Sequence, residues 1–308
     1  MSDENNCRHH GSADITGGQY PNETMRLLIE RSSCRSFEDK KIPPDTLNPV
    51  LRAGIHAPTG GNLQPFSIIK IENKAVSEKL GEMCRQKFIG TAPVNLIFCI
   101  DWRRTERWAK LETAPYAANN SFRHFWIAFQ DTIIAAQNIC TAADAMQLGT
   151  VYIGTIMEYF DDIRKMFELP DGVFPVVLLC LGYPKERPSP RKKLAVDVIV
   201  HDEKYRDLSD DDLIAAFEKK YPDRKFEIND ERLEYIENVC RRAHGEEFAR
   251  KCLDEIKKRG HINMAQYYFG LHYCADEMPV GNENFVRQIE RAGFNWFREN
   301  ELKGKKDG

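Results

Sequence analysis

A long apolar segment near the middle of the chain is the feature that most constrains the fold. The segment Trp126–Leu148 is a run of apolar and small residues that contains neither proline nor glycine. Such a run predicts a buried helix, and Gly149 directly after it is of the residue type that commonly ends a helix in the left-handed conformation. We therefore expect one central helix. It fits the core of a monomer and the interface of a dimer equally well.

Shorter segments on both sides of this helix predict a mixture of helices and strands. Apolar residues at helical spacing predict helices over Glu23–Arg31 with Asn22 as N-cap, Asp45–Ala57 with Asp45 as N-cap, Ala75–Arg85 and Asp161–Phe167. Strand-like patterns cover Pro65–Glu72, Val94–Asp101, Gly149–Ile156 and Phe174–Gly182. No G-x-G-x-x-G follows any of these strands, and no G-x-x-x-x-G-K-[ST] occurs. A Rossmann or P-loop nucleotide site is therefore unsupported.

Charge and cysteine content exclude several classes of protein. Lys and Arg number 44 and Asp and Glu 47, a net charge of −3, so the chain has no bulk attraction for nucleic acid or an anionic membrane. No apolar stretch approaches the roughly 18 residues of a membrane span, and the N-terminus is polar. The nine cysteines lack a C-x-x-C, and the spacing of Cys240 and His244 fits no standard zinc pattern. We expect a cytoplasmic protein with free thiols and no metal, nucleic-acid or membrane partner.

The character of the sequence divides the chain into three parts. Residues 1–21 are polar and glycine-rich and predict a flexible lead-in. Residues 22–204 contain the helix and strand patterns described above. Residues 205–308 are rich in Glu, Lys and Arg and mostly helical in pattern. Because their apolar stripes are too sparse for an independent core, we expect them to form a helical extension packed on the preceding part.

The first candidate site lies at the end of the first predicted helix. The run from Arg31 to Ser36 holds two guanidiniums and three hydroxyls, with Arg31, Ser32, Ser33 and Arg35 at its centre. Arginine forks match phosphate oxygens in pairs, and hydroxyls add short hydrogen bonds. The segment therefore fits a phosphate clamp, and a polar helix exit is the alternative.

The second and third candidate sites are loops that suit a flat polar ring. In the first loop, Gly60 lets backbone approach a ligand, and amide side chains offer donors and acceptors. Its candidate residues are Pro58, Thr59, Gly60, Asn62 and Gln64. The second is a strand that ends at a glycine, with Tyr152, Ile153, Gly154 and Thr155 as candidates. An ordinary loop and a buried strand with a bend are the alternatives. A late basic run with Arg191 and Lys193 fits either a further phosphate contact or a solvated turn.

The order and spacing of these segments resemble the nitroreductase family, from about Thr24 to Tyr221. The closer resemblance is to the oxygen-insensitive NADPH nitroreductase and flavin reductase branch. It includes the runs Leu148–Gly154, Cys180–Pro184 and His201–Tyr205. The resemblance implies an α+β nitroreductase fold, with a central and mostly antiparallel sheet flanked by helices. It also implies two FMN sites at the interface of a homodimer, which makes residues 22–204 the FMN-binding domain.

The resemblance also implies a role for each candidate residue. Arg31, Ser32 and Ser33 correspond to residues that hold the FMN phosphate, and Arg35 to the cation at the N1/O2 side of the ring. The loop of Pro58, Thr59, Gly60, Asn62 and Gln64 corresponds to one that reaches the flavin across the dimer. Gln86 corresponds to a polar group on the pyrimidine edge, and Tyr152, Ile153, Gly154 and Thr155 to the strand facing the ring. Arg191 and Lys193 correspond to a late basic pair at the phosphate.

The activity implied is that of an FMN-dependent oxidoreductase. Hydride from NAD(P)H would pass in a ping-pong cycle to a small aromatic acceptor such as a nitroaromatic, a quinone or a flavin. The alternatives are a flavin-binding sensor or store, and a reductive dehalogenase or ene-reductase-like member of the family. The segment that receives the NADPH 2′-phosphate has no clear counterpart, and Arg224-Lys225 and Arg241-Arg242 are candidates by composition alone.

Aromatic residues are dense near the C-terminus. They are Tyr267, Tyr268, Phe269, Tyr273, Phe294, Trp296 and Phe297. They fit either a lining for the open face of the flavin or an anchor that holds the extension to the rest of the chain. Anchoring is the more common role of such residues.

Overall fold

The computed structural model describes residues 20–297, so nearly all of the predicted lead-in 1–21 lies outside the described residues. The described chain forms two compact units. One unit, which we call the body, comprises Tyr20–Pro190 and residues 283–297; the other, which we call the arm, comprises Arg191–Asn282. The division thus falls at 190/191 rather than at the expected 204/205, and the chain returns to the body after the arm. That the arm packs on the body stays a prediction.

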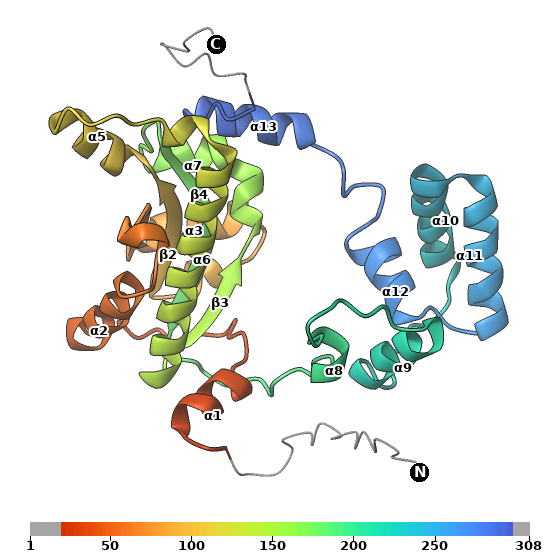
Figure 1. Ribbon diagram of the computed structural model, residues 1–308. Coiled ribbons are helices and arrows are strands. Elements are labelled where there is room, and N and C mark those ends of the chain that lie inside the picture. Colours follow the sequence, from red (N-terminus) through yellow and green to blue (C-terminus); the bar gives the residue numbers. More distant parts are fainter. Residues whose placement is uncertain (1–19, 298–308) are drawn as a thin grey trace, which may run out of the picture. The chain divides into compact units, whose positions relative to one another are not determined.

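A four-stranded antiparallel sheet forms the centre of the body (Figure 1). Its strands are β1 (Phe66–Ile71), β2 (Val94–Asp101), β3 (Gly149–Ile153) and β4 (Val173–Gly182), in the order β1-β2-β4-β3. Every residue of β2 and β4 is buried, as expected of central strands that are covered on both faces. The α+β fold predicted from the sequence is confirmed.

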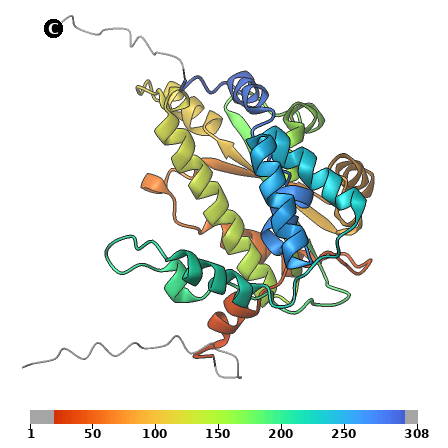
Figure 2. The same ribbon diagram turned by 90° about the vertical axis from the view of Figure 1, so that its right-hand side faces the viewer.

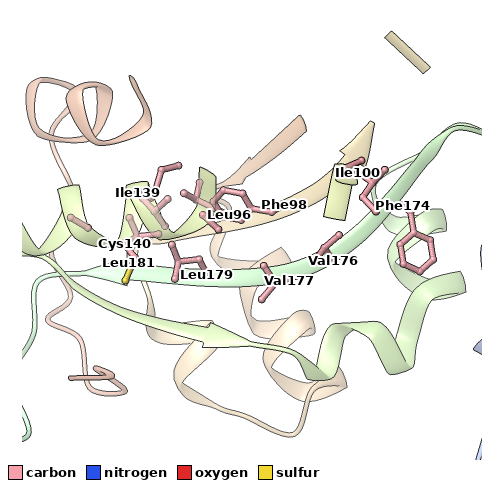
Figure 3. Close-up of a cluster of buried hydrophobic side chains, with 14 of the residues drawn as sticks. Leu96, Phe98, Ile100, Ile139, Cys140, Phe174, Val176, Val177, Leu179 and Leu181 are labelled. Carbon is pink, nitrogen blue, oxygen red and sulfur yellow. The ribbon is translucent and has the colours of Figure 1, made fainter. Parts of the chain in front are cut away.

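Helices cover both faces of this sheet. The helices of the body are α1 (Glu23–Glu30), α2 (Pro44–Ile55), α3 (Lys74–Met83), α4 (Phe88–Thr91), α5 (Arg103–Leu111), α6 (Phe122–Ala145), α7 (Phe160–Met166) and α13 (Asn282–Arg291). The helix α6 is the predicted central helix, and its Ile139 and Cys140 pack on Leu96 and Leu179 of the sheet (Figure 3). Alternate residues of β2 face a second core, where Ile97 and Cys99 meet residues of α3, α4 and α7.

Two predicted helix ends are wrong, for reasons of local geometry. Asn22 caps α1 as expected, but α2 begins at Pro44, and Asp45 lies in its first turn without a capping bond. The central helix ends at Ala145, and Gln147 takes the left-handed conformation (φ 61°) that we expected of Gly149. Gly149 instead begins β3, where a Cβ atom would lie 2.6 Å from the Cβ of Cys34. Close packing, rather than a helix cap, requires this glycine.

The arm has a small hydrophobic core of its own, contrary to our expectation. Its helices are α8 (Val196–Ile199), α9 (Asp210–Lys220), α10 (Asp230–His244), α11 (Glu246–Arg259) and α12 (Met264–Tyr267), followed by a π-helical turn at Tyr268–His272. The helices α10 and α11 lie side by side (Figure 2). Ile236, Ala249 and Ile256 are fully buried between them and the segment after α11. The sequence analysis missed this core because only a few apolar residues form it.

The segment after the arm belongs to the hydrophobic core of the body. Ile289, Ala292 and Phe294 are buried with the residues of α6 and β4. The N–H of Gly172 donates to the carbonyl of Ala292 at 2.7 Å, which ties the segment to the start of β4. For Phe294 and its neighbours, anchoring is therefore the observed role.

Candidate functional site

The segment that was predicted to bind phosphate lies along the exposed edge of the sheet. Ser33 forms a parallel bridge with Thr150 of β3, and the N–H of Cys34 donates to the carbonyl of Thr150 at 2.9 Å. Arg31, Ser32 and Ser33 therefore lie directly beside the strand predicted to face the ring. The structure brings these two candidate segments together although they are more than a hundred residues apart in the chain.

Arg31 carries an unsatisfied buried donor at this edge. Its Nε donates to Cys140 Sγ at 3.1 Å, but its Nη2 is buried and has no hydrogen-bond partner among the described residues. A charged donor without an acceptor is costly to bury, so the site is suited to an anionic ligand. Arg35 is exposed and points elsewhere, with its guanidinium carbon 6.0 Å from the centre of the Phe88 ring. The two arginines are thus free to serve different parts of one ligand.

A cavity of about 430 Å³ opens beside Arg31. It lies between α1, the end of α6 and the loop that follows β4. Its lining is Arg26, Leu27, Glu30, Arg31, Glu38, Asp144, Gln147, Tyr183, Pro184 and Arg187. Of these residues, sequence reasoning singled out Arg31 alone. It missed Arg187, which lies four residues before Arg191, and Asp144, an acidic residue within the apolar helix.

Asp144 is the most deeply buried charged group of this cavity. Its Oδ1 accepts a hydrogen bond from Arg187 Nη1 at 3.0 Å, while its Oδ2 is buried and without a partner among residues 20–297. Burial raises the pKa of this carboxyl, and the neighbouring Arg187 and Arg31 oppose that shift. Two guanidiniums therefore act on this carboxyl, and Arg187 contacts it directly.

Gln86 and the end of β3 meet a short distance along the same edge. The side-chain Nε2 of Gln86 donates to Thr155 Oγ1 at 3.2 Å, which brings together two residues predicted for the ring. Gly154, directly before Thr155, is exposed, and a Cβ atom on it would meet nothing within 4 Å. Such open space beside backbone is what a flat ligand requires.

The other two candidate residues of the strand, Tyr152 and Ile153, are less exposed than Gly154. Ile153 is buried in the core below the strand. Tyr152 is partly buried, its hydroxyl donates to Gln137 Oε1 at 3.4 Å, and burial raises its pKa. Tyr152 is therefore a neutral group at this edge.

The loop after α2 is held against the central helix. The N–H of Gly60 donates to the carboxylate of Asp131 at 3.1 and 3.2 Å, and Gln64 Nε2 donates to the carbonyl of Ile55 at 2.9 Å. Asn62 and Gln64 both have positive φ, so the loop is tightly turned. Among residues 20–297, no hydrogen bond joins this loop to the edge at β3. The loop residues concerned are Pro58, Thr59, Gly60, Asn62 and Gln64.

The late basic residues lie in the arm and not in the body. Arg191 and Lys193 are exposed there. Two of the candidates for a 2′-phosphate site are already paired, since Arg241 contacts Glu237 and Glu246, and Arg242 contacts Asp276 at 2.5 Å. Arg224 and Lys225 form no ion pair within the described part of the chain, which leaves them as the better candidates.

Three general features of the described residues bear on the kind of site. Between residues 20 and 297, no three His, Cys, Asp or Glu side chains gather as metal ligands would. No helix in that range is long and apolar enough to cross a bilayer. All cysteines in it are free thiols, and all but Cys252 are buried.

Comparison with known proteins gives a consistent result. The oxygen-insensitive NADPH nitroreductase of Salmonella typhimurium is 30% identical over 198 residues, which are 64% of this chain and 80% of that protein. The structure of the hypothetical oxidoreductase YcnD from Bacillus subtilis covers 89% of this chain and 98% of its own, with a TM-score of 0.68 and 25% identity. The NADPH:FMN oxidoreductase from Vibrio harveyi, solved in complex with NAD+, has a TM-score of 0.60 and 27% identity over 65% of this chain and 84% of its own.

The family assignment rests on the body. The model of the Nitroreductase family matches residues 28–183, just over half of the chain. That range contains the phosphate-binding candidates, the loop after α2, Gln86 and all of β3. The resemblance seen in the sequence is therefore confirmed, and the chain belongs to the nitroreductase family.

Proposed function

We propose that this chain is an FMN-dependent oxidoreductase that takes electrons from NAD(P)H and acts in the cytoplasm. The relatives that support this carry the names oxygen-insensitive NADPH nitroreductase and FMN reductase [NAD(P)H]. The cofactor is FMN and the electron donor is NAD(P)H. The acceptors we propose are nitroaromatics, quinones or free flavins, reduced in a ping-pong cycle.

The observation that carries the cofactor assignment is the unpartnered Nη2 of Arg31. A phosphate at this point would satisfy a buried charged donor that the protein itself leaves unpaired. Ser32 and Ser33 extend the same segment along β3 and offer hydroxyls to the same group. FMN has a single terminal phosphate, which fits the single site formed by Arg31, Ser32 and Ser33 beside β3.

The remaining residues of the edge suit the ring. The bound flavin would supply the hydride chemistry, and the protein supplies position and charge. Arg35 would hold negative charge at the N1/O2 side, since its guanidinium is free of carboxylate partners in the described residues. Gln86 and Thr155 form a polar pair for the pyrimidine edge, while Gly154 leaves room for close approach. Tyr152 and Ile153 would hold the strand in place below the ring.

We propose that the chain works as a homodimer through the outer face of α6. Phe122 and Trp126 on this helix are 51% and 52% exposed, and Ile134 is 40% exposed. Exposed large apolar residues on one long helix are typical of a protein interface. In such a dimer, the loop of Pro58, Thr59, Gly60, Asn62 and Gln64, held to the same helix by Asp131, would reach the partner's flavin. Arg191 and Lys193 of the arm would add a basic pair at a phosphate.

Steady-state oxidation of NAD(P)H by the FMN-loaded protein tests this function. We expect slow oxidation alone and fast oxidation with a quinone or a nitroaromatic, with parallel lines in double-reciprocal plots at varied donor and acceptor. A sensor or flavin store would bind FMN but show no stimulation by any acceptor. A reductive dehalogenase or ene-reductase-like enzyme would respond to its own class of acceptor and not to quinones.

A further inference from the structure

We infer that Arg187 is a second phosphate-binding residue of the flavin site and that Asp144 positions it. This inference rests on the proposed function, and it adds a guanidinium from the body itself to the site of Arg31. It is supported by the shared cavity, the two fixed hydrogen bonds of Arg187, and the buried Nη2 of Arg31, which has no partner among the described residues.

Arg187 is held rigidly although it lies in a loop. Its Nη1 donates to Asp144 Oδ1 and its Nη2 to the carbonyl of Leu148, both at 3.0 Å. These contacts fix the guanidinium at the end of α6, and its side chain remains 43% exposed. A guanidinium has five N–H donors, so others remain for a ligand. The loop therefore presents a preorganised fork to the cavity that Arg31 also lines.

Asp144 is buried at a position where loss of hydration makes a charged carboxylate energetically unfavourable. Its side chain is 4% exposed, and its Oδ2 has no hydrogen-bond partner within the described residues. An acid this deeply buried is stabilised by cations, and both Arg187 and Arg31 act on it in this way. Two guanidiniums and one carboxylate leave one positive charge uncompensated among Arg31, Asp144 and Arg187 in the lining of the cavity. A phosphate is the anion that the proposed cofactor would place there.

Arg26 lines the same cavity and provides a matched contrast. It is paired on both sides, with Glu23 at 2.5 Å and with Glu30 at 2.6 Å along α1. Its charge is thus neutralised within its own helix. Glu38, the remaining acid of the lining, is exposed to solvent, which screens its charge. Arg31 and Arg187 are therefore the guanidiniums free to hold an anion.

The test is titration of the flavin-free full-length protein with FMN and, separately, with riboflavin, which lacks the phosphate. Quenching of flavin fluorescence gives both Kd values, and the ratio of the riboflavin Kd to the FMN Kd measures what the phosphate contributes. Arg187→Ala should lower this ratio about tenfold to a hundredfold, the loss of a charged hydrogen bond, with riboflavin binding unchanged. Arg26→Ala, the control, should leave the ratio at the wild-type value.

Variants of Asp144 distinguish a role in positioning Arg187 from a general contribution to protein stability. Asp144→Ala removes the acceptor of Arg187 and should lower the ratio as Arg187→Ala does. Asp144→Asn keeps an oxygen acceptor and should restore the ratio to the wild-type value or above, since it also removes a negative charge. A ratio that Arg187→Ala leaves unchanged, or an equal loss of FMN and riboflavin binding, would overturn the inference. A wild-type protein that binds neither flavin would instead overturn the proposed function.

Discussion

Replacement of Phe294 by alanine tests whether the chain after the arm is part of the body. Phe294 is fully buried, and its ring packs edge-to-face with Phe125 of α6 (5.2 Å between centroids, 77°) and Phe174 of β4 (6.5 Å, 88°). Loss of a buried phenylalanine typically costs about 3–5 kcal/mol, because the apolar contacts are lost and a cavity remains. We expect that cost here, since two elements, α6 and β4, pack around this one ring.

Urea unfolding of the FMN-loaded protein, at fixed protein and FMN concentrations, measures the effect. With an m value of about 3 kcal/mol per M, the midpoint should fall by about 1–1.7 M. Phe297→Ala is the matched control, since Phe297 lies in the same segment but is 37% exposed, and its midpoint should barely move. Equal and small shifts for the two variants would refute the placement of Phe294 in the core of the body.

Three further predictions follow from single positions. Arg35→Ala should lower the reduction potential of the bound flavin, because the cation for the N1/O2 side is lost; an unchanged potential in dye-equilibration measurements would reject that role. Gly149→Ala should destabilise the protein by about 1–3 kcal/mol in the same urea assay, since its Cβ would meet Cys34 at 2.6 Å, and Cys34→Gly in the same chain should restore stability. Burial raises the pKa of Cys84 to about 11, so iodoacetamide at pH 8 should label Cys252 long before Cys84; equal rates would contradict this. Because the folded pKa of Cys84 lies above the usual pKa of a thiol, the buried thiol stabilises the protein at neutral pH. This contribution is lost as the pH rises towards 11.

The sequence predicted those parts of the fold that depend on local periodicity. The central helix and β1 were found because a long apolar run and an alternating pattern each have few alternatives. Helix ends were less predictable. The left-handed residue after the central helix is Gln147 and not Gly149, because Gly149 is needed where β3 closely approaches Cys34. Phe294 was assigned to the extension because its neighbours in sequence are charged. Its burial depends on α6 and β4, which are far from it in the chain.

The candidate site was predictable to the same extent. Arg31, Gln86 and Thr155 were found by resemblance, and their proximity along the edge of β3 agrees with that reading. Asp144 and Arg187 were missed because their cavity is assembled from α1, the end of α6 and the loop after β4. Helical periodicity places Asp144 on a buried face of the helix but does not identify its partner. The ion pair between Asp144 and Arg187 could therefore not be inferred without the structure.

Identification of the chromophore tests the central claim most directly. The full-length protein, purified without added flavin, should be yellow, with absorbance bands of an oxidised flavin. Acid precipitation should release the chromophore, and chromatography should identify it as FMN, in about one equivalent per chain because each chain contributes one Arg31 site. Release of FAD, or of no flavin from a folded protein that also fails to bind added FMN, would contradict the account.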